Sequence, residues 1–106
     1  TKDILRNYLE DYCVNRIQKD DYDDLKNGGT FTKEGYHHFV FDNFFHNYLS
    51  RKHWKVPYQS TSQMLKDNLH CTTKRVGRHK LSVFAVARFD KQTETYKPKP
   101  FKKDNY

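Results

Sequence analysis

Cysteine and long apolar runs are scarce in this chain, and each scarcity excludes a class of protein. Cys13 and Cys71 are its only cysteines, too few for the disulfide scaffold of a small secreted domain. No stretch approaches the roughly 18 consecutive apolar residues of a membrane-spanning helix, and no signal-peptide pattern is present. We therefore expect a cytoplasmic protein without membrane contact, whose two cysteines are ordinary thiols.

Motifs for catalysis and metal binding are also missing. The chain has no GxxxxGK[ST] phosphate loop, and no DxD carboxylate pair lies on a predicted strand. His70 beside Cys71 is the only adjacent base and nucleophile, and no orienting group accompanies this pair. The histidines lack zinc-ligand spacing, and the Asp-rich residues 20–24 lack the DxDxDG spacing of a calcium loop. We expect no enzyme activity, no small-molecule substrate, no metal and no other cofactor.

Length and aromatic content indicate one small domain. The chain has 106 residues, of which 35% are hydrophobic and 16% aromatic, so aromatic side chains must supply much of the core. It opens on Thr1 rather than Met, and we expect it to be one domain of a larger protein. We assign residues 1–89 to this domain and residues 90–106, with two Lys-Pro pairs, to a basic, disordered tail.

Two segments in the first half have the apolar periodicity of amphipathic helices. In residues 3–17 apolar side chains recur at helical spacing, with Asp3 as the expected N-cap. A second helix is expected after Asp42, where Phe44, Phe45, Tyr48 and Leu49 form a stripe and basic residues follow in the last turn. Helical packing of these stripes would build most of the core.

A third, shorter helix is expected over residues 61–69. Ser60 and Gln63 have the spacing of a capping box, in which each side chain bonds the backbone amide of the other residue. Apolar residues at positions 64, 65 and 69 give this helix a side that can face the core.

Three short segments read as strands. Residues 36–41 are aromatic and β-branched, and residues 72–76 and 81–89 are joined by a glycine-containing basic turn at residues 77–80. Both alternating faces of 81–89 carry apolar residues, which predicts the middle strand of the sheet. Residues 18–30 show no periodicity and predict a solvated loop.

This order of elements predicts an α+β winged helix, a helix-turn-helix variant with three helices and a small three-stranded antiparallel sheet. Residues 36–41 would pair with the last strand, and the basic hairpin would be the wing. An aromatic base-stacking platform is the alternative for the Phe-rich segment and Trp54, but its periodicity favours core positions. The expected core residues are Phe39, Phe41, Phe45, Leu49, Leu65 and Val83.

The positive charge is concentrated in the last third of the chain. Residues 72–106 hold ten Lys and Arg against three acids, whereas residues 1–71 hold ten of each. Such an asymmetry is the electrostatic footprint of a surface that meets a polyanion, although a solubilising surface would have the same composition. Nucleic acid is the favoured partner.

The expected contacts lie on the third helix and the wing. On the outward face of the helix, Gln63 could read adenine edges and Lys66 a guanine or a phosphate, although Asp67 beside them would repel the backbone. Wing contacts would be to phosphates of any sequence, with affinity from counterion release. The candidate wing residues are Lys74, Arg75, Arg78, His79 and Lys80.

Residues 36–86 also resemble a known family at the level of motifs. The runs YHHFVFDNFF, LSRKHWKV, STSQMLKDNL and RHKLSVFAV resemble the C-terminal winged-helix-like domain of primase-helicase replication proteins from phages, plasmids and mobile elements. The resemblance covers roughly half of the chain and carries over no catalytic residue. It implies a role in DNA binding, or in docking within a replication protein.

Three classes of function remain after this reading. The favoured one is a DNA-binding module of a larger replication protein that contacts phosphates through its basic wing. The second is a winged helix that docks on an acidic protein partner. The third, a small enzyme, has only the His70-Cys71 pair in its support.

Overall fold

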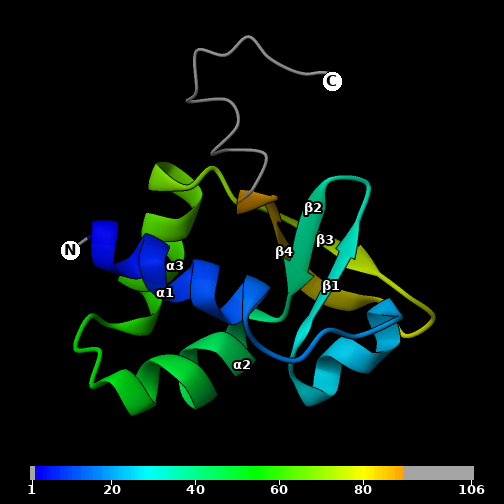
Figure 1. Ribbon diagram of the computed structural model, residues 1–106, viewed down its shortest axis with the longest axis horizontal. Helices are drawn as coiled ribbons and strands as arrows, with labels where there is room; N and C mark the ends of the chain where they lie inside the picture. Colours follow the sequence, from blue (N-terminus) through cyan, green and yellow to red (C-terminus); the bar gives the residue numbers. More distant parts are fainter. Residues whose placement is uncertain (1, 90–106) are drawn as a thin grey trace, which may run out of the picture.

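The computed structural model describes residues 2–89 and has an α+β fold. Figure 1 shows the longer helices gathered on one side of a twisted sheet. In chain order the elements are α1 (Lys2–Val14), the 3-10 helix η1 (Tyr22–Asn27), β1 (Thr30–Lys33), β2 (Tyr36–Phe39), α2 (Phe41–Asn43) with its continuation, α3 (Tyr58–Asn68), β3 (Thr72–Val76) and β4 (Leu81–Ala87). No helix of this part of the chain is long and apolar enough to cross a membrane. The predicted tail of residues 90–106 lies outside the described residues.

The sheet has four antiparallel strands in the order β1-β2-β4-β3. The predicted pairing between the first expected strand and the last is confirmed, with Tyr36 opposite Ala87 and Phe39 opposite Phe84. The middle position of β4, between β2 and β3, is confirmed as well. The predicted strand 36–41 is shorter than expected, because Phe41 already begins the next helix.

The prediction of three strands and a solvated loop over residues 18–30 was wrong. Leu25 in η1 is completely buried, and β1 pairs with β2 through a two-residue turn at Glu34 and Gly35. Both turn residues have positive φ, 55° and 87°, which is the geometry of a tight hairpin turn. Glu rarely adopts this conformation, so the turn has a weak sequence signal.

Strand alternation gives the sheet two different faces. Phe39, Phe84 and Val86 are buried on the face that the helices cover, which we call the helix face. Val83 and Ala85 are buried on the opposite face, which we call the η1 face because η1 contacts β1 and β4 there. The helix face contains the main core: Leu5, Leu9, Tyr12, Cys13, Phe39, Phe41, Phe44, Tyr48, Leu49, Leu65, Cys71, Phe84, Val86 and Phe89.

Two of the expected core residues are placed differently. Val83 is fully buried, but on the η1 face and outside the main cluster. Phe45 packs on the cluster and stays partly exposed, whereas its neighbour Phe44 is completely buried. The helix continues through a π-helical turn at Phe44–Tyr48 and a 3-10 turn at Leu49–Lys52. Both rings belong to one apolar stripe, and Phe44 is the one whose ring meets Phe39 and Tyr12 in the main core.

The helix starts also differ from the predictions. Asp42 lies inside the first turn of α2, where its carboxylate accepts a hydrogen bond from the Tyr58 hydroxyl. α3 begins at Tyr58, so Ser60 is inside the helix and the predicted capping box is not formed. The residue before this start is Pro57, whose extended backbone lies at the N-cap position.

Candidate nucleic-acid interface

The β3–β4 hairpin presents its basic residues to solvent. All five predicted wing residues, Lys74, Arg75, Arg78, His79 and Lys80, are exposed. The connecting turn has positive φ at both ends, 79° at Gly77 and 55° at Lys80. The turn therefore carries three consecutive basic or histidine side chains outside the sheet.

The sheet divides these five residues between its two faces. Lys74 lies opposite Val83 on the η1 face, where its ammonium is 5.8 Å from the ring centroid of Tyr22. Arg75 lies opposite Ser82, one position along the strand, and so belongs to the helix face. A flat partner cannot contact Lys74 and Arg75 equally. Single substitutions of these two residues would therefore test the two faces of the sheet separately.

The predicted residues of α3 lie on the same side of the sheet as Arg75. Lys66 is exposed, and its ammonium is 5.8 Å from the ring centroid of Phe84 on the helix face. Gln63 is exposed too, but its amide nitrogen donates to the Asp67 carboxylate at 2.9 Å. Lys66 is thus available to an anion, whereas one of the two amide donors of Gln63 is already used by an acidic neighbour.

An acidic residue distant in sequence reaches the tip of the hairpin. The backbone amide of Arg78 donates to both carboxylate oxygens of Asp23, at 3.0 and 3.3 Å. Gly77 leaves room for this contact, since a Cβ there would come within 2.3 Å of an Asp23 oxygen. The hairpin is therefore held against η1 by a contact that charge counting along residues 74–88 could not reveal.

A second cationic surface lies between α1 and the turn Leu49–Lys52. Here a hollow of about 690 Å³ is lined by Tyr12, Asn15, Arg16, Ile17, Gly29, Asn47, Tyr48, Arg51 and Lys52. We call it the helical hollow. Sequence analysis missed it because residues 1–71 contain equal numbers of acids and bases, which folding then separates.

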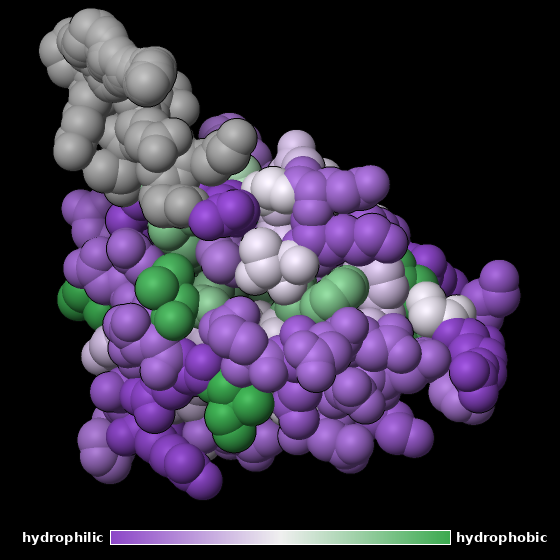
Figure 2. Space-filling view, turned by 45° about the vertical axis from the view of Figure 1, so that its right-hand side comes forward, coloured by the Kyte–Doolittle hydropathy of each residue, from purple (hydrophilic) through white to green (hydrophobic). Residues whose placement is uncertain are grey.

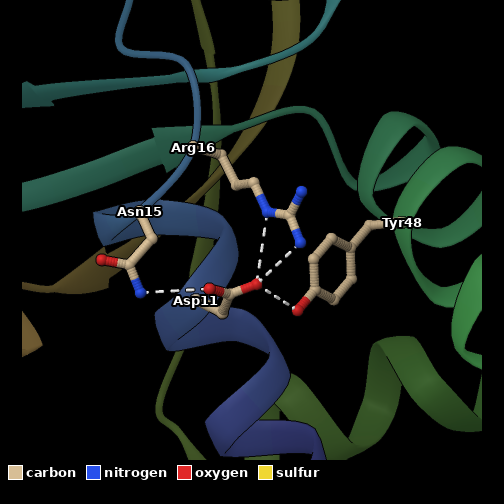
Figure 3. Close-up of polar contacts among 4 residues, drawn as sticks. All are labelled: Asp11, Asn15, Arg16 and Tyr48. Atoms are coloured by element: carbon tan, nitrogen blue, oxygen red, sulfur yellow. Dashed lines mark hydrogen bonds and ion pairs between the residues drawn. The ribbon is translucent and has the colours of Figure 1, made fainter.

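One carboxylate orders the wall of this hollow (Figure 3). An Asp11 oxygen accepts from the Tyr48 hydroxyl at 2.6 Å and from two nitrogens of Arg16 at 3.0 and 3.2 Å. The other Asp11 oxygen accepts from the Asn15 amide at 3.0 Å. The Arg16 guanidinium also lies over the Tyr48 ring, 5.0 Å from its centroid.

The same hydrogen bonds shift two pKa values. The Tyr48 hydroxyl and the Asn15 amide, together with Arg16, lower the pKa of Asp11 to about 2. Burial and the hydrogen bond to Asp11 raise the pKa of Tyr48 to about 12. Asp11 is therefore ionised and Tyr48 is neutral across the physiological pH range.

The remaining candidate chemistry lies at the cysteines and histidines. Cys71 is buried, and burial raises the pKa of its thiol to about 12, which makes it a poor nucleophile at neutral pH. Within residues 2–89, no group of three or more His, Cys, Asp or Glu is placed to hold a metal ion.

Comparisons with protein families, curated proteins and solved structures find no match to this chain. Function is therefore inferred from the residues and their contacts.

Proposed function

We propose that this chain is the DNA-binding module of a larger, cytoplasmic replication protein, and that it binds mainly through phosphate contacts from the β3–β4 hairpin. The observation that carries the proposal is the exposed turn between the paired strands, where Arg78, His79 and Lys80 follow one another. Cations on an exposed hairpin can neutralise phosphates and release counterions without reading sequence. The proposal assigns no catalytic residue.

The arrangement of elements supports a winged-helix reading. A helix, a strand and two further helices precede a basic hairpin, and β2 and β3 flank β4 in the sheet. In this reading β3 and β4 form the wing, α3 is the recognition helix, and η1 with β1 is an addition ahead of β2. This order supports the proposal of a helix-turn-helix variant whose second helix enters a groove.

The contacts favour positioning on DNA over base readout. Lys66 on α3 and Arg75 on β3 share the helix face, so both can reach one polyanion. The bond from Gln63 to Asp67 uses one of its two amide N–H donors and keeps an acidic side chain next to any adenine edge that Gln63 would read. Figure 2 shows a largely hydrophilic surface with small, separate hydrophobic groups, which suits a polar ligand.

One observation favours the alternative function, docking on an acidic protein partner. The Asp23 carboxylate already sits on the backbone amide of Arg78, so the hairpin tip accepts a carboxylate in its own fold. The carboxylates of an acidic partner segment could bind the neighbouring basic side chains of the hairpin.

The experiment compares the variant R78A/K80A with the wild type on single- and double-stranded DNA and RNA over a range of salt concentrations. Each lost phosphate contact should lower the slope of log affinity against log salt by about 0.9 on duplex DNA. The loss should be similar for every sequence tested. The control K26A/K55A removes two exposed cations outside the hairpin and should bind like the wild type.

Equal binding by R78A/K80A and the wild type at low and high salt would refute the proposal. If neither protein binds nucleic acid, but the wild type binds an acidic peptide that R78A/K80A binds more weakly, docking is the function. Preference among the four nucleic acids identifies the physiological ligand class.

A further inference from the structure

The helical hollow combines a concave shape with cations from two separate segments. Arg16 follows α1, and Arg51 and Lys52 end the helix that begins at Phe41. Asn15 and Asn47 line the same space, and each carries a side-chain amide; that of Asn15 also donates to Asp11. The hollow thus offers charged and neutral donors that converge from more than one element.

The charges in the hollow are not balanced by the protein. Asp11 pairs with Arg16, but within the described part of the chain neither Arg51 nor Lys52 forms an ion pair with a carboxylate. Lys52 instead lies 5.3 Å from the ring centroid of Tyr48 and 5.7 Å from that of Tyr8. Three cations against one carboxylate leave two positive charges for an external anion.

Arg16 is held in place before any ligand arrives. Nε and one terminal nitrogen donate to Asp11, whereas the other terminal nitrogen donates no hydrogen bond to this carboxylate. In Figure 3 this nitrogen points away from Asp11. A guanidinium fixed by a second residue loses little conformational entropy when it binds an anion.

We propose that the helical hollow is a phosphate-binding site, which takes the phosphate group of a nucleotide or of a polynucleotide backbone. The two unpaired charges match the roughly −1.5 to −2 charge of a phosphate monoester at neutral pH. Guanidinium groups also match the oxygens of a phosphate in geometry. This site uses none of the hairpin residues, so it does not depend on the function proposed for the hairpin.

The direct test is an NMR titration of the wild type with inorganic phosphate, with ATP and with a DNA oligonucleotide. The probes are the side-chain amide signals of Asn15 and Asn47 and the Nε–H of Arg16. We expect saturable shifts of these signals in at least one titration. In the variant R51Q/K52Q the affinity should fall roughly tenfold or more, because two charged contacts are lost.

The control K26Q/K55Q removes the same amount of charge from exposed positions outside the hollow. It should retain wild-type shifts, and circular dichroism should show that both variants fold. No shift in any of the three titrations, or an equal loss in both variants, would overturn the proposal.

The three titrants identify the source of the phosphate. Oligonucleotide affinity lowered by R51Q/K52Q indicates a polynucleotide backbone, whereas shifts confined to phosphate and ATP indicate a free phosphorylated molecule. R78A/K80A should leave the phosphate and ATP titrations unchanged. Failure of the hairpin proposal is thereby distinguishable from failure of the phosphate site.

Discussion

The two faces of the sheet are buried in different ways. The helix face is covered by long amphipathic helices and packs on an aromatic cluster that includes Phe39, Phe44 and Phe84. The η1 face is covered by one short 3-10 helix, with Leu25 buried and the Tyr22 ring against Phe31 and His38. Only the amphipathic helices on the helix face leave a periodic pattern of apolar residues in the sequence. The cover of the η1 face depends on a few long-range contacts.

The largest expected effect is on the helix face. Phe44→Ala should lower the free energy of unfolding by about 3–5 kcal/mol, because the deleted ring is fully buried and leaves a cavity. Phe45→Ala should cost clearly less, since Phe45 is only partly buried. Chemical denaturation of both variants measures the difference. Equal losses would mean that the π-helical turn does not place Phe44 alone in the core.

On the η1 face, Leu25→Ala tests whether this cover belongs to the cooperative fold. Leu25 is completely buried, so truncation should lower the free energy of unfolding by about 2–4 kcal/mol. The Asp23–Arg78 contact should weaken at the same time, because η1 carries Asp23. Hydrogen exchange of the Arg78 amide reports that loosening. A loss below about 1 kcal/mol, with protection unchanged, would show that η1 is only a surface segment.

The same contrast explains which parts of the structure sequence analysis could predict. Helical spacing of Leu5, Leu9 and Tyr12 and the alternation within β4 led correctly to α1 and to a central strand. β1 and η1 were missed because residues 18–30 show no periodicity, and the burial of this segment depends on partners far along the chain. Segments without a local pattern are decided by tertiary contacts.

The candidate binding sites also differ in how far they could be predicted from the sequence. The basic turn at residues 77–80 is contiguous in sequence, and its exposure was predicted correctly. The helical hollow joins Arg16 to Arg51 and Lys52, which are far apart in sequence and hidden in a region of zero net charge. The contact between Asp23 and the hairpin could not be predicted from the sequence either. Only the structure shows that Gly77 leaves the space that the Asp23 carboxylate occupies.

Gly77→Ala examines the junction between η1 and the hairpin. The new Cβ would meet the Asp23 carboxylate, and the positive φ of 79° disfavours any L side chain. We expect a loss of about 1–3 kcal/mol in the free energy of unfolding. In an Asp23→Ala background the steric part should disappear, so a double-mutant cycle should give a coupling energy. Additive effects would show that only the backbone conformation of Gly77 matters.

The smallest expected effect concerns pH, and it separates the two faces again. Burial lowers the pKa of His38 on the η1 face below its ordinary 6.5, opposed by the Phe31 carbonyl and Glu34 and reinforced by Lys74 and Lys33. The unfolded chain therefore binds the proton more readily, and stability should fall as pH drops from 6.5 through the folded-state pKa.

Asp11, on the helix side, has its pKa lowered to about 2, so its contribution is complete above 3.8 and is lost only as pH falls towards 2. Mild acid should thus weaken the η1 face first. Denaturation between pH 7 and 5 should show a loss of stability in the wild type that is reduced in His38→Phe, and hydrogen exchange at Leu25 and Arg78 should rise before exchange in α1. Uniform loosening of both faces in this range would contradict the assignment to His38.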